Sequence, residues 1–268
     1  MDLAEAIGML MREVLMKIGN IEYPSLKEKV SDAEWRARVD LAAIYRLITL
    51  FGWWDMSQSP AGARIPGTDQ YLFNPMGLLF EEITASSLVR ISLDGEILSD
   101  TPFSILRGAW YPLEAVFAVR EDANFVIHSH DRYAAALSAR RDKLLPISQP
   151  ANFALAEGVA YHDYDGVETY EDKMAPVQAS LGDKNYLILH NHGMVTIGAL
   201  APMAFGRMEN LRTACEIQLL AGQDRDLISV GEDVRPVFAE ELRKGVVVDN
   251  LWPALLRKLD RLDPSYAD

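Results

Sequence analysis

Four of the five histidines in this 268-residue sequence fall into two short pairs, His128-Ser129-His130 and His190-Asn191-His192. In a β-strand, residues i and i+2 point to the same face, so His128 and His130 can offer two imidazoles to one metal ion. A third imidazole from the end of a second strand would complete a three-histidine site with positions open for water and substrate. His192 is the candidate for that third ligand. The alternative, on spacing alone, is a structural or merely exposed pair.

The two remaining histidines have less defined roles. His190 lies two residues from His192 and could be a fourth ligand, a proton carrier or a polar strand residue, of which the last is favoured. His162, in the segment AYHDY, is interpreted as a hydrogen-bonded structural histidine.

The elements that must position these histidines are predicted from the spacing of apolar residues. Residues 124–130, NFVIHSH, read as a buried strand that ends on the first pair, and residues 185–190 read as a strand that leads into the second. Ser31 and Glu34 have the spacing of a capping box. Further predicted elements are short strands within 52–75, a hairpin over 88–98 around Asp94-Gly95, a strand over 158–164, and helices over 32–51, 110–120, 133–141, 172–182 and 202–220. This alternation predicts a three-layer α/β/α domain whose sheet is either parallel or mixed.

Three parts of the chain are expected. Residues 1–30 form an N-terminal helical extension, in which MDLAEAIGMLMREVLMK is an amphipathic helix rather than a signal peptide. Residues 31–235 form the α/β domain, and residues 236–268 form a C-terminal helical tail.

The composition excludes several classes of protein. A formal net charge of -13 and a pI near 4.8 argue against a nucleic-acid partner, because a phosphate-binding surface needs clustered Lys and Arg. No stretch reaches the roughly 18 apolar residues of a membrane span. The single cysteine, Cys215, excludes an intrachain disulfide and indicates a cytoplasmic protein.

Several separate segments carry a resemblance to a known family. FVIHSHDRYAAALSA, LLPISQ, GVAYHDYDGV, LGDKNYLILHNHGMVTIG and ACEIQ, in this order, resemble the class II aldolase/adducin superfamily, especially its bacterial adducin-like branch. NPMGLLFEEITASSLV and WPALLRKLDRLDPSY belong to the same pattern, so the resemblance runs from Trp35 to the end of the chain.

The resemblance implies a class II aldolase-like fold with a central, largely antiparallel sheet, and active sites between the subunits of a homotetramer. In that family, the HxH pair and the histidine of an NHG motif bind a divalent cation, which carries over to His128, His130 and His192. The cation is usually zinc, with iron and manganese as the alternatives. It chelates the oxygens of a small hydroxy-carbonyl substrate and, as a Lewis acid, stabilises the enediolate formed when a carbon–carbon bond breaks.

This chain departs from the family at the acid/base position. Aldolases of the family use a Glu upstream of the HxH pair, and counting back from His128 places that position at Arg107-Gly108-Ala109-Trp110, where no carboxylate stands. Glu114, His190 and Tyr161 are the candidate substitutes within the chain. A neighbouring subunit is another source of the group.

A second departure concerns the substrate. Related sequences have a polar run resembling Thr-His-Ile-Ser before an arginine, whereas this chain reads Ser59-Pro60-Ala61-Gly62-Ala63-Arg64, which argues against a sugar phosphate. Arg64, Arg107 and Trp110 are the candidate substrate-binding residues. A less polar or aromatic substrate would suit the aromatic residues Trp53, Trp54, Trp110 and Tyr111, for which core packing is the alternative.

Three functions are therefore weighed. The first is a metal-dependent lyase that cleaves a carbon–carbon bond of a hydroxy or keto acid, by retro-aldol reaction or decarboxylation. The second is a non-haem iron oxygenase that cleaves such a bond oxidatively, which needs no glutamate base. The third is a non-catalytic, adducin-like module. The identity of the bound metal separates these three.

Overall fold

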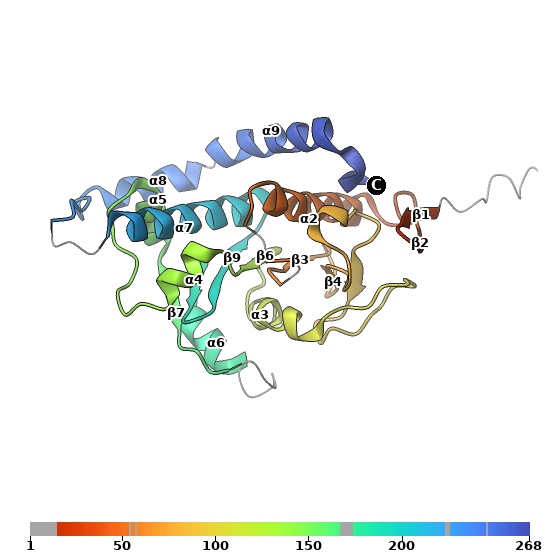
Figure 1. The fold of residues 1–268 in the computed structure, drawn as a ribbon, viewed down its shortest axis with the longest axis horizontal. Helices are drawn as coiled ribbons and strands as arrows, with labels where there is room; N and C mark the ends of the chain where they lie inside the picture. The colour runs from red at the N-terminus through yellow and green to blue at the C-terminus, as the bar shows by residue number, and fades with distance from the viewer. Residues whose placement is uncertain (1–14, 54, 57, 167–173, 223–225, 245) are drawn as a thin grey trace, which may run out of the picture.

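The computed structural model describes residues 15–53, 55–56, 58–166, 174–222, 226–244 and 246–268 (Figure 1). Its centre is a sheet whose described strands follow the order β5-β4-β3-β6-β9-β8-β7. The bounds are β3 (Ala61–Arg64), β4 (Tyr71–Phe73), β5 (Val89–Ile91), β6 (Phe125–Ser129), β7 (Val159–His162), β8 (Tyr186–Leu189) and β9 (Gly193–Gly198). Neighbouring strands are antiparallel except β7 and β8, which are parallel. The prediction of a largely antiparallel sheet is therefore confirmed.

Helices cover both faces of this sheet, as Figure 1 shows. One layer contains α2 (Asp32–Leu50), α4 (Arg132–Ser138), α5 (Gln149–Glu157) and α7 (Ala201–Ala221), with α8 (Arg235–Lys244) and α9 (Val246–Leu262) outside it. The opposite layer contains α3 (Arg107–Phe117) and α6 (Met174–Leu181), and the short 3-10 helices are η1 (Phe80–Glu82) and η3 (Pro264–Ala267). The three-layer α/β/α prediction is confirmed. Within the described part of the chain, no helix is both long enough and apolar enough to span a bilayer.

The helix starts follow from local side-chain chemistry. Ser31 caps α2, because its hydroxyl accepts a hydrogen bond from the Glu34 N–H at 3.2 Å. The predicted capping box is only half formed, since the Glu34 carboxylate instead binds Arg38. Asp131 caps α4 through the N–H groups of Tyr133 and Ala134. Because Asp131 directly follows the second histidine of the HxH pair, this cap also fixes where β6 ends.

The C-terminal segment packs against the start of the domain. Arg46 of α2 makes an ion pair of 2.8 Å with Asp263, next to η3. The backbone N–H of Ala85 donates to the Tyr266 carbonyl at 2.9 Å, and that of Ser86 donates to Asp268 at 2.8 Å. The tail is therefore helical and joined to the domain by side-chain and backbone contacts.

The N-terminal helix prediction is wrong for the residues that the structure describes. Leu15–Ile18 forms strand β1, which pairs antiparallel with β2 (Ile21–Pro24). Gly19 in the turn has φ +57, a conformation that favours a tight two-residue hairpin over a continuing helix. Residues 1–14, the rest of the predicted helix, lie outside the described residues.

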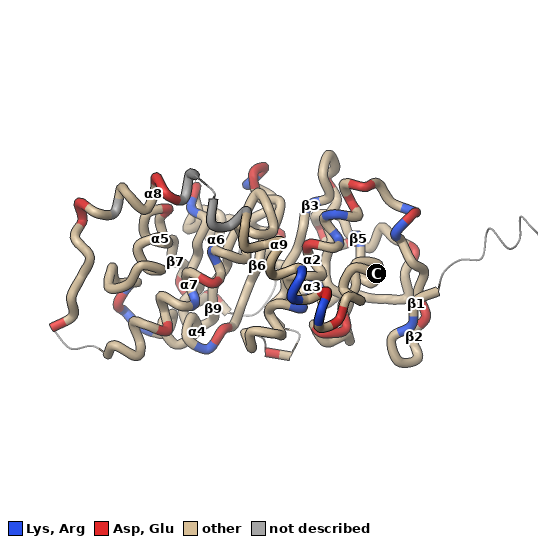
Figure 2. Tube along the Cα trace, turned by 90° about the horizontal axis from the view of Figure 1, so that it is seen from above, with Lys and Arg blue, Asp and Glu red and all other residues tan. Residues whose placement is uncertain are grey.

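Charged residues are distributed along the whole described chain. Figure 2 shows Lys and Arg interspersed with Asp and Glu on most elements, and no described element carries a continuous basic stripe. This distribution agrees with the acidic net charge of -13.

Candidate metal centre

The two histidine pairs meet because β6 lies beside β9. His128 is the fourth residue of β6 and His130 directly follows that strand, while His192 lies in the turn between β8 and β9. The register pairs His128 with Val195, which brings the turn alongside the end of β6. Asn191 in the turn has φ +57, a left-handed conformation that Asn tolerates better than most residues.

Glycine 193 allows the turn to approach β6. A Cβ placed on Gly193 would lie 2.3 Å from the carbonyl oxygen of Ser129 and 3.3 Å from the His130 ring. No other residue type leaves this space, so the glycine after His192 is a steric requirement of the site.

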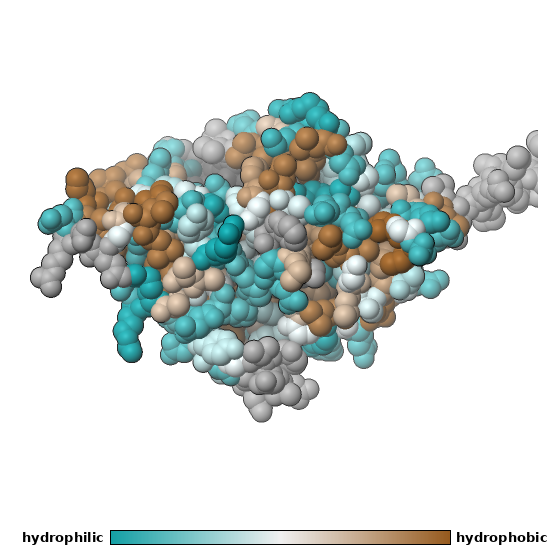
Figure 3. Space-filling view, in the orientation of Figure 1, coloured by the Kyte–Doolittle hydropathy of each residue, from teal (hydrophilic) through white to brown (hydrophobic). Residues whose placement is uncertain are grey.

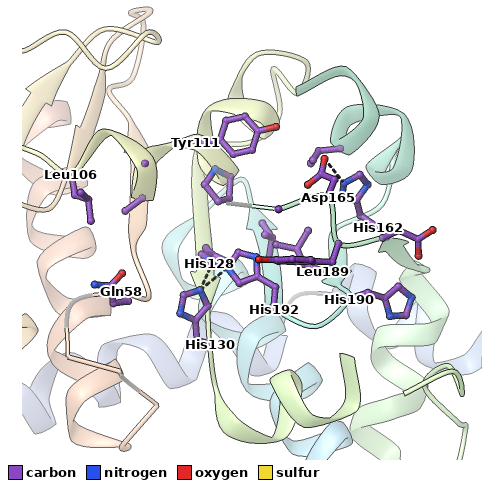
Figure 4. A pocket seen from close by; sticks show the side chains of 18 residues that line it. Gln58, Leu106, Tyr111, His128, His130, His162, Asp165, Leu189, His190 and His192 are labelled. Carbon is purple, nitrogen blue, oxygen red and sulfur yellow. Dashed lines mark hydrogen bonds and ion pairs between the residues drawn. The ribbon is translucent and has the colours of Figure 1, made fainter. Parts of the chain in front are cut away.

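The three imidazoles converge on one point (Figure 4). The Nε2 atoms of His128 and His130 are 2.8 Å apart, and those of His130 and His192 are also 2.8 Å apart. All three ligand atoms lie within 4.8 Å of one another. No described carboxylate belongs to this group, so three imidazole nitrogens form the donor set that the described residues offer.

The outer nitrogens of two rings are held by hydrogen-bond acceptors. The Nδ1 of His128 is 2.9 Å from the Met194 carbonyl oxygen, and the Nδ1 of His130 is 2.5 Å from the Asp55 carboxylate. Both partners accept hydrogen bonds, so each Nδ1 donates, and Nε2 is the nitrogen of each ring whose lone pair is left for a metal. A proton on one Nε2 could satisfy only one of the two short contacts. A cation between the rings satisfies all three nitrogens, so the donor set fits a divalent metal.

The pKa values of His128 and His192 also favour a metal site. Burial, followed by the neighbouring His192 and His130, lowers the pKa of His128 well below its usual value. Burial and His130 lower the pKa of His192 to about 4, although Asp55 acts in the opposite direction. These two rings are therefore neutral at pH 7, as metal-ligating histidines must be.

Asp55 and Ser59 are hydrogen-bonded to each other and to His130. The Ser59 hydroxyl donates to the other oxygen of Asp55 at 2.8 Å and accepts a hydrogen bond from the His130 N–H at 3.0 Å. Sequence reasoning missed Asp55, and it treated the segment from Ser59 only as a place where polar groups had been lost. No local pattern links the segment to His130, which lies 75 residues beyond Asp55.

A cavity of about 330 Å³ opens beside the triad. The three histidines line one side, and Tyr111, His162 and Asp165 line the other, with Leu189 between them (Figure 4). Its walls are largely apolar, and the described lining contains Asp163 and Asp165 but no Lys or Arg.

Two acid/base candidates lie near the cavity. His190 lines it, but its Nδ1 donates to the Ser138 carbonyl at 2.7 Å and its ring points away from the triad in Figure 4. Tyr161 stacks on the His190 ring with centroids 5.8 Å apart, and its hydroxyl accepts a hydrogen bond from the Leu144 N–H at 2.8 Å. Tyr161 is not among the described residues that line the cavity.

Three other predicted site residues, Glu114, Arg107 and Trp110, make their contacts away from the cavity. Glu114 is 3% exposed and pairs with Arg107 at 2.5 Å, within the layer that contains α3. Trp110 is fully buried and donates from Nε1 to the Leu93 carbonyl at 2.7 Å. None of these three lines the cavity as described, so the structure gives no support for their predicted roles in catalysis or substrate binding.

Arg64 and Trp53 also serve packing rather than the cavity. Arg64 donates to the Tyr71 hydroxyl at 2.9 Å and to the Phe117 carbonyl at 3.1 Å, which occupies its guanidinium. Trp53 is buried and stacks against Phe205. Core packing is thus the role of Trp53 and Trp110, whereas Tyr111 does line the cavity. Trp54 lies outside the described residues.

Comparison with known proteins identifies the family of this chain. Residues 39–219 match the model described as the class II aldolase and adducin N-terminal domain. A Caulobacter vibrioides protein named for the class 2 aldolases is 42% identical over 264 residues, which is 94% of this chain and 100% of that protein. Alpha-adducin of Rattus norvegicus is 40% identical over 198 residues, which is 72% of this chain but 26% of the adducin.

Solved structures show the same relationship. The crystal structure of an aldolase II superfamily protein from Pseudomonas syringae superposes with a TM-score of 0.86 at 39% identity, covering 91% of this chain and 100% of that one. An L-fuculose 1-phosphate aldolase from Glaciozyma antarctica shares the fold, with a TM-score of 0.76 at 21% identity over 91% of this chain and 96% of its own. The class II aldolase-like fold that the sequence predicted is confirmed. The chain belongs to the class II aldolase and adducin family.

Proposed function

We propose that this protein is a metal-dependent lyase that cleaves a carbon–carbon bond of a hydroxy or keto acid lacking a phosphate group. The observation that carries the proposal is the convergence of the Nε2 atoms of His128, His130 and His192 at the wall of a cavity, with adjacent pairs 2.8 Å apart. The outer nitrogens of two of these rings are already held by acceptors. This arrangement is what a catalytic three-histidine site requires.

Each part of the site would contribute a distinct step. The three imidazoles would hold the cation, and the Met194 carbonyl and Asp55 would keep two rings in the ligating tautomer. A divalent cation there would act as a Lewis acid toward the oxygens of the substrate as negative charge develops on them. The apolar walls, including Leu189 and Val195, would limit water around the reacting group.

The lining of the cavity supports a substrate without phosphate. A phosphate group needs cationic side chains or several backbone N–H donors, and the described lining offers no Lys or Arg. Asp163 and Asp165, which also line the cavity, would instead repel a dianion. A volume of about 330 Å³ accommodates a small acid rather than a polymer.

We also propose that the protein acts as a homo-oligomer, with a tetramer expected from the family. Apolar side chains outside the cavity support association, because large exposed apolar patches commonly mark interfaces. Figure 3 shows hydrophobic patches at the α8 end of the molecule and over α9. Exposed apolar residues in and around these helices are Leu220, Ile228, Val237 and Leu251. A neighbouring subunit would then be able to supply an acid/base group to the cavity.

A non-catalytic, adducin-like role is the second candidate, and the 40% identity to rat alpha-adducin favours it. A module that only binds other proteins would have no use for three imidazoles whose Nε2 atoms face one another at the wall of a cavity. The geometry of the triad therefore ranks the enzyme above the module.

Metal analysis tests the proposal. The protein is purified without added metal and analysed for bound elements beside a His128→Ala/His130→Ala double variant. A His190→Ala variant is the matched control, because His190 lies two residues from a proposed ligand yet outside the triad. We expect about one equivalent per subunit in the wild type and the control, and none in the double variant.

The metal that is found decides the assay. Zinc or manganese directs the search to release of an aldehyde, an oxo acid or carbon dioxide from a panel of hydroxy and keto acids. Tightly bound iron redirects it to oxygen consumption with the same acids, as a non-haem oxygenase requires. Absence of metal from the wild type, even after reconstitution, overturns the enzyme proposal and leaves the non-catalytic module.

A further inference from the structure

Asp55 touches a proposed metal ligand without being able to ligate the same ion. Its Oδ2 lies 2.5 Å from the Nδ1 of His130, the nitrogen on the opposite edge of the ring from the converging Nε2 atoms. A carboxylate in this place holds the proton on Nδ1 and leaves the lone pair on Nε2. It also makes the imidazole a stronger electron donor, because its negative charge lies next to the N–H group.

Ser59 fixes the carboxylate and the ligand in one closed set of contacts. Its hydroxyl donates to Asp55 Oδ1 at 2.8 Å, while its oxygen accepts from the backbone N–H of His130 at 3.0 Å. His130 is therefore held at its ring and at its backbone by residues of one segment. Ser59 is fully buried, so water does not compete for these bonds as it would at the surface.

The same segment also holds the other histidine of the HxH pair. The backbone N–H of His128 donates to the carbonyl oxygen of Pro60 at 2.9 Å. Asp55, Ser59 and Pro60 of this stretch thus lie against the end of β6, and among them they contact both histidines of the HxH pair. The third proposed ligand, His192, has no contact with this stretch among the hydrogen bonds of the described residues.

We propose that Asp55, held in place by Ser59, is a positioning residue that sets the tautomer and orientation of His130 and thereby the affinity of the site for its cation. The proposal rests on the proposed metal centre. It predicts that replacing Asp55, which lies 75 positions before His130 in the sequence, weakens the binding of the cation.

The first test measures zinc affinity by competition with a chromophoric chelator, in wild type, Asp55→Ala, Asp55→Asn and Ser59→Ala. Loss of a carboxylate that holds a ligating histidine weakens metal binding by about 10- to 100-fold, and this is the result expected for Asp55→Ala. Asp55→Asn keeps an acceptor for the Nδ1 proton but removes the charge, so it should lose less. Ser59→Ala should fall between Asp55→Asn and the wild type.

Controls separate positioning from general damage. Asp69→Asn changes a fully exposed carboxylate on the loop between β3 and β4 and should bind zinc as the wild type does. Thermal unfolding in the presence of EDTA checks that each variant folds. Zinc affinity of Asp55→Ala within twofold of the wild type, in a folded protein, would overturn the proposal.

A second measurement needs no metal at all. In the metal-free protein, the ¹⁵N chemical shifts of His130 report which ring nitrogen carries the proton. We expect Nδ1–H in the wild type and a mixture of the two tautomers in Asp55→Ala. An unchanged tautomer in Asp55→Ala would contradict the proposal. If the wild type binds no metal, the proposed function fails, and this tautomer measurement still decides the role of Asp55.

Discussion

Replacing Gly193 by alanine should damage the proposed metal centre although none of its ligands is replaced. The new Cβ would lie 2.3 Å from the Ser129 carbonyl oxygen, whereas ordinary contact begins at 3.4 Å. Because the obstacle is backbone, the turn that carries His192 must move away from β6 by about 1 Å. Metal–ligand distances in proteins vary by only about 0.2 Å, so a shift of His192 by about 1 Å should lower zinc affinity by at least about 10-fold.

The same substitution should also destabilise the fold. Forcing extra atoms into a packed interior costs about 1–3 kcal/mol. For a chain of this size, that corresponds to a melting temperature lower by roughly 3–10 °C. Differential scanning fluorimetry in EDTA measures the stability loss, and chelator competition measures the affinity of the folded fraction.

Gly198→Ala provides the matched control at the other end of β9. Its Cβ would lie 2.4 Å from the Ala204 backbone nitrogen, so it meets an equally rigid obstacle far from the histidines. Gly198→Ala should lose stability and keep zinc affinity, whereas Gly193→Ala should lose both. Equal zinc affinity in the two glycine variants would refute the steric argument.

Three further predictions concern the rest of the fold. Arg38 is 1% exposed and pairs with Glu34 at 2.8 Å. Arg38→Ala should lower the free energy of unfolding in urea by about 3–5 kcal/mol, because the Glu34 carboxylate stays buried without its partner. A loss below about 1 kcal/mol would contradict this. Burial raises the pKa of Asp40, so the folded state binds this proton more tightly than the unfolded state, and its ionised form costs stability above the folded pKa. Asp40→Asn, which still accepts from Trp252 Nε1, should therefore melt at or above the wild type at pH 7, with the gain lost below pH 3.8; a lower melting temperature at pH 7 would oppose this. Burial raises the pKa of Cys215 to about 12, so a thiol reagent at pH 8 should label it only after unfolding, and rapid labelling of the native protein would contradict its burial.

The sequence predicted those elements whose signals are local. β6 is an unbroken buried strand, and its apolar run and HxH pair were visible directly. β9 was not predicted, because GMVTIG begins and ends with glycine, which strands disfavour. The structure explains both glycines, since each lets the backbone of β9 pass close to another segment. The two glycines that argued against a strand are therefore required by the tertiary packing of β9.

The sequence predicted only those site residues that belong to a short, recognisable motif. The three histidines stand in two short motifs, and their convergence follows from the pairing of β6 with β9. Asp55 has no such motif, because its role depends on a segment folding back against a strand 75 residues later. Arg107 and Trp110 were chosen by counting back from His128, yet Trp110 lies on the fully buried side of α3. Counting positions along the sequence cannot tell which of these residues line the cavity and which are buried in the core.

The bare lone pairs at the centre of the triad have a thermodynamic consequence for the protein as a whole. Folding brings the Nε2 atoms of His128 and His130 to 2.8 Å, and lone pairs on these two nitrogens would repel each other unless a cation lies between them. A cation that binds only the folded chain removes this repulsion and adds its own binding energy to the stability. At a free concentration 100 times Kd, the added stability is about 2.7 kcal/mol. Metal supply would then set how much of the protein is folded as well as how much is active.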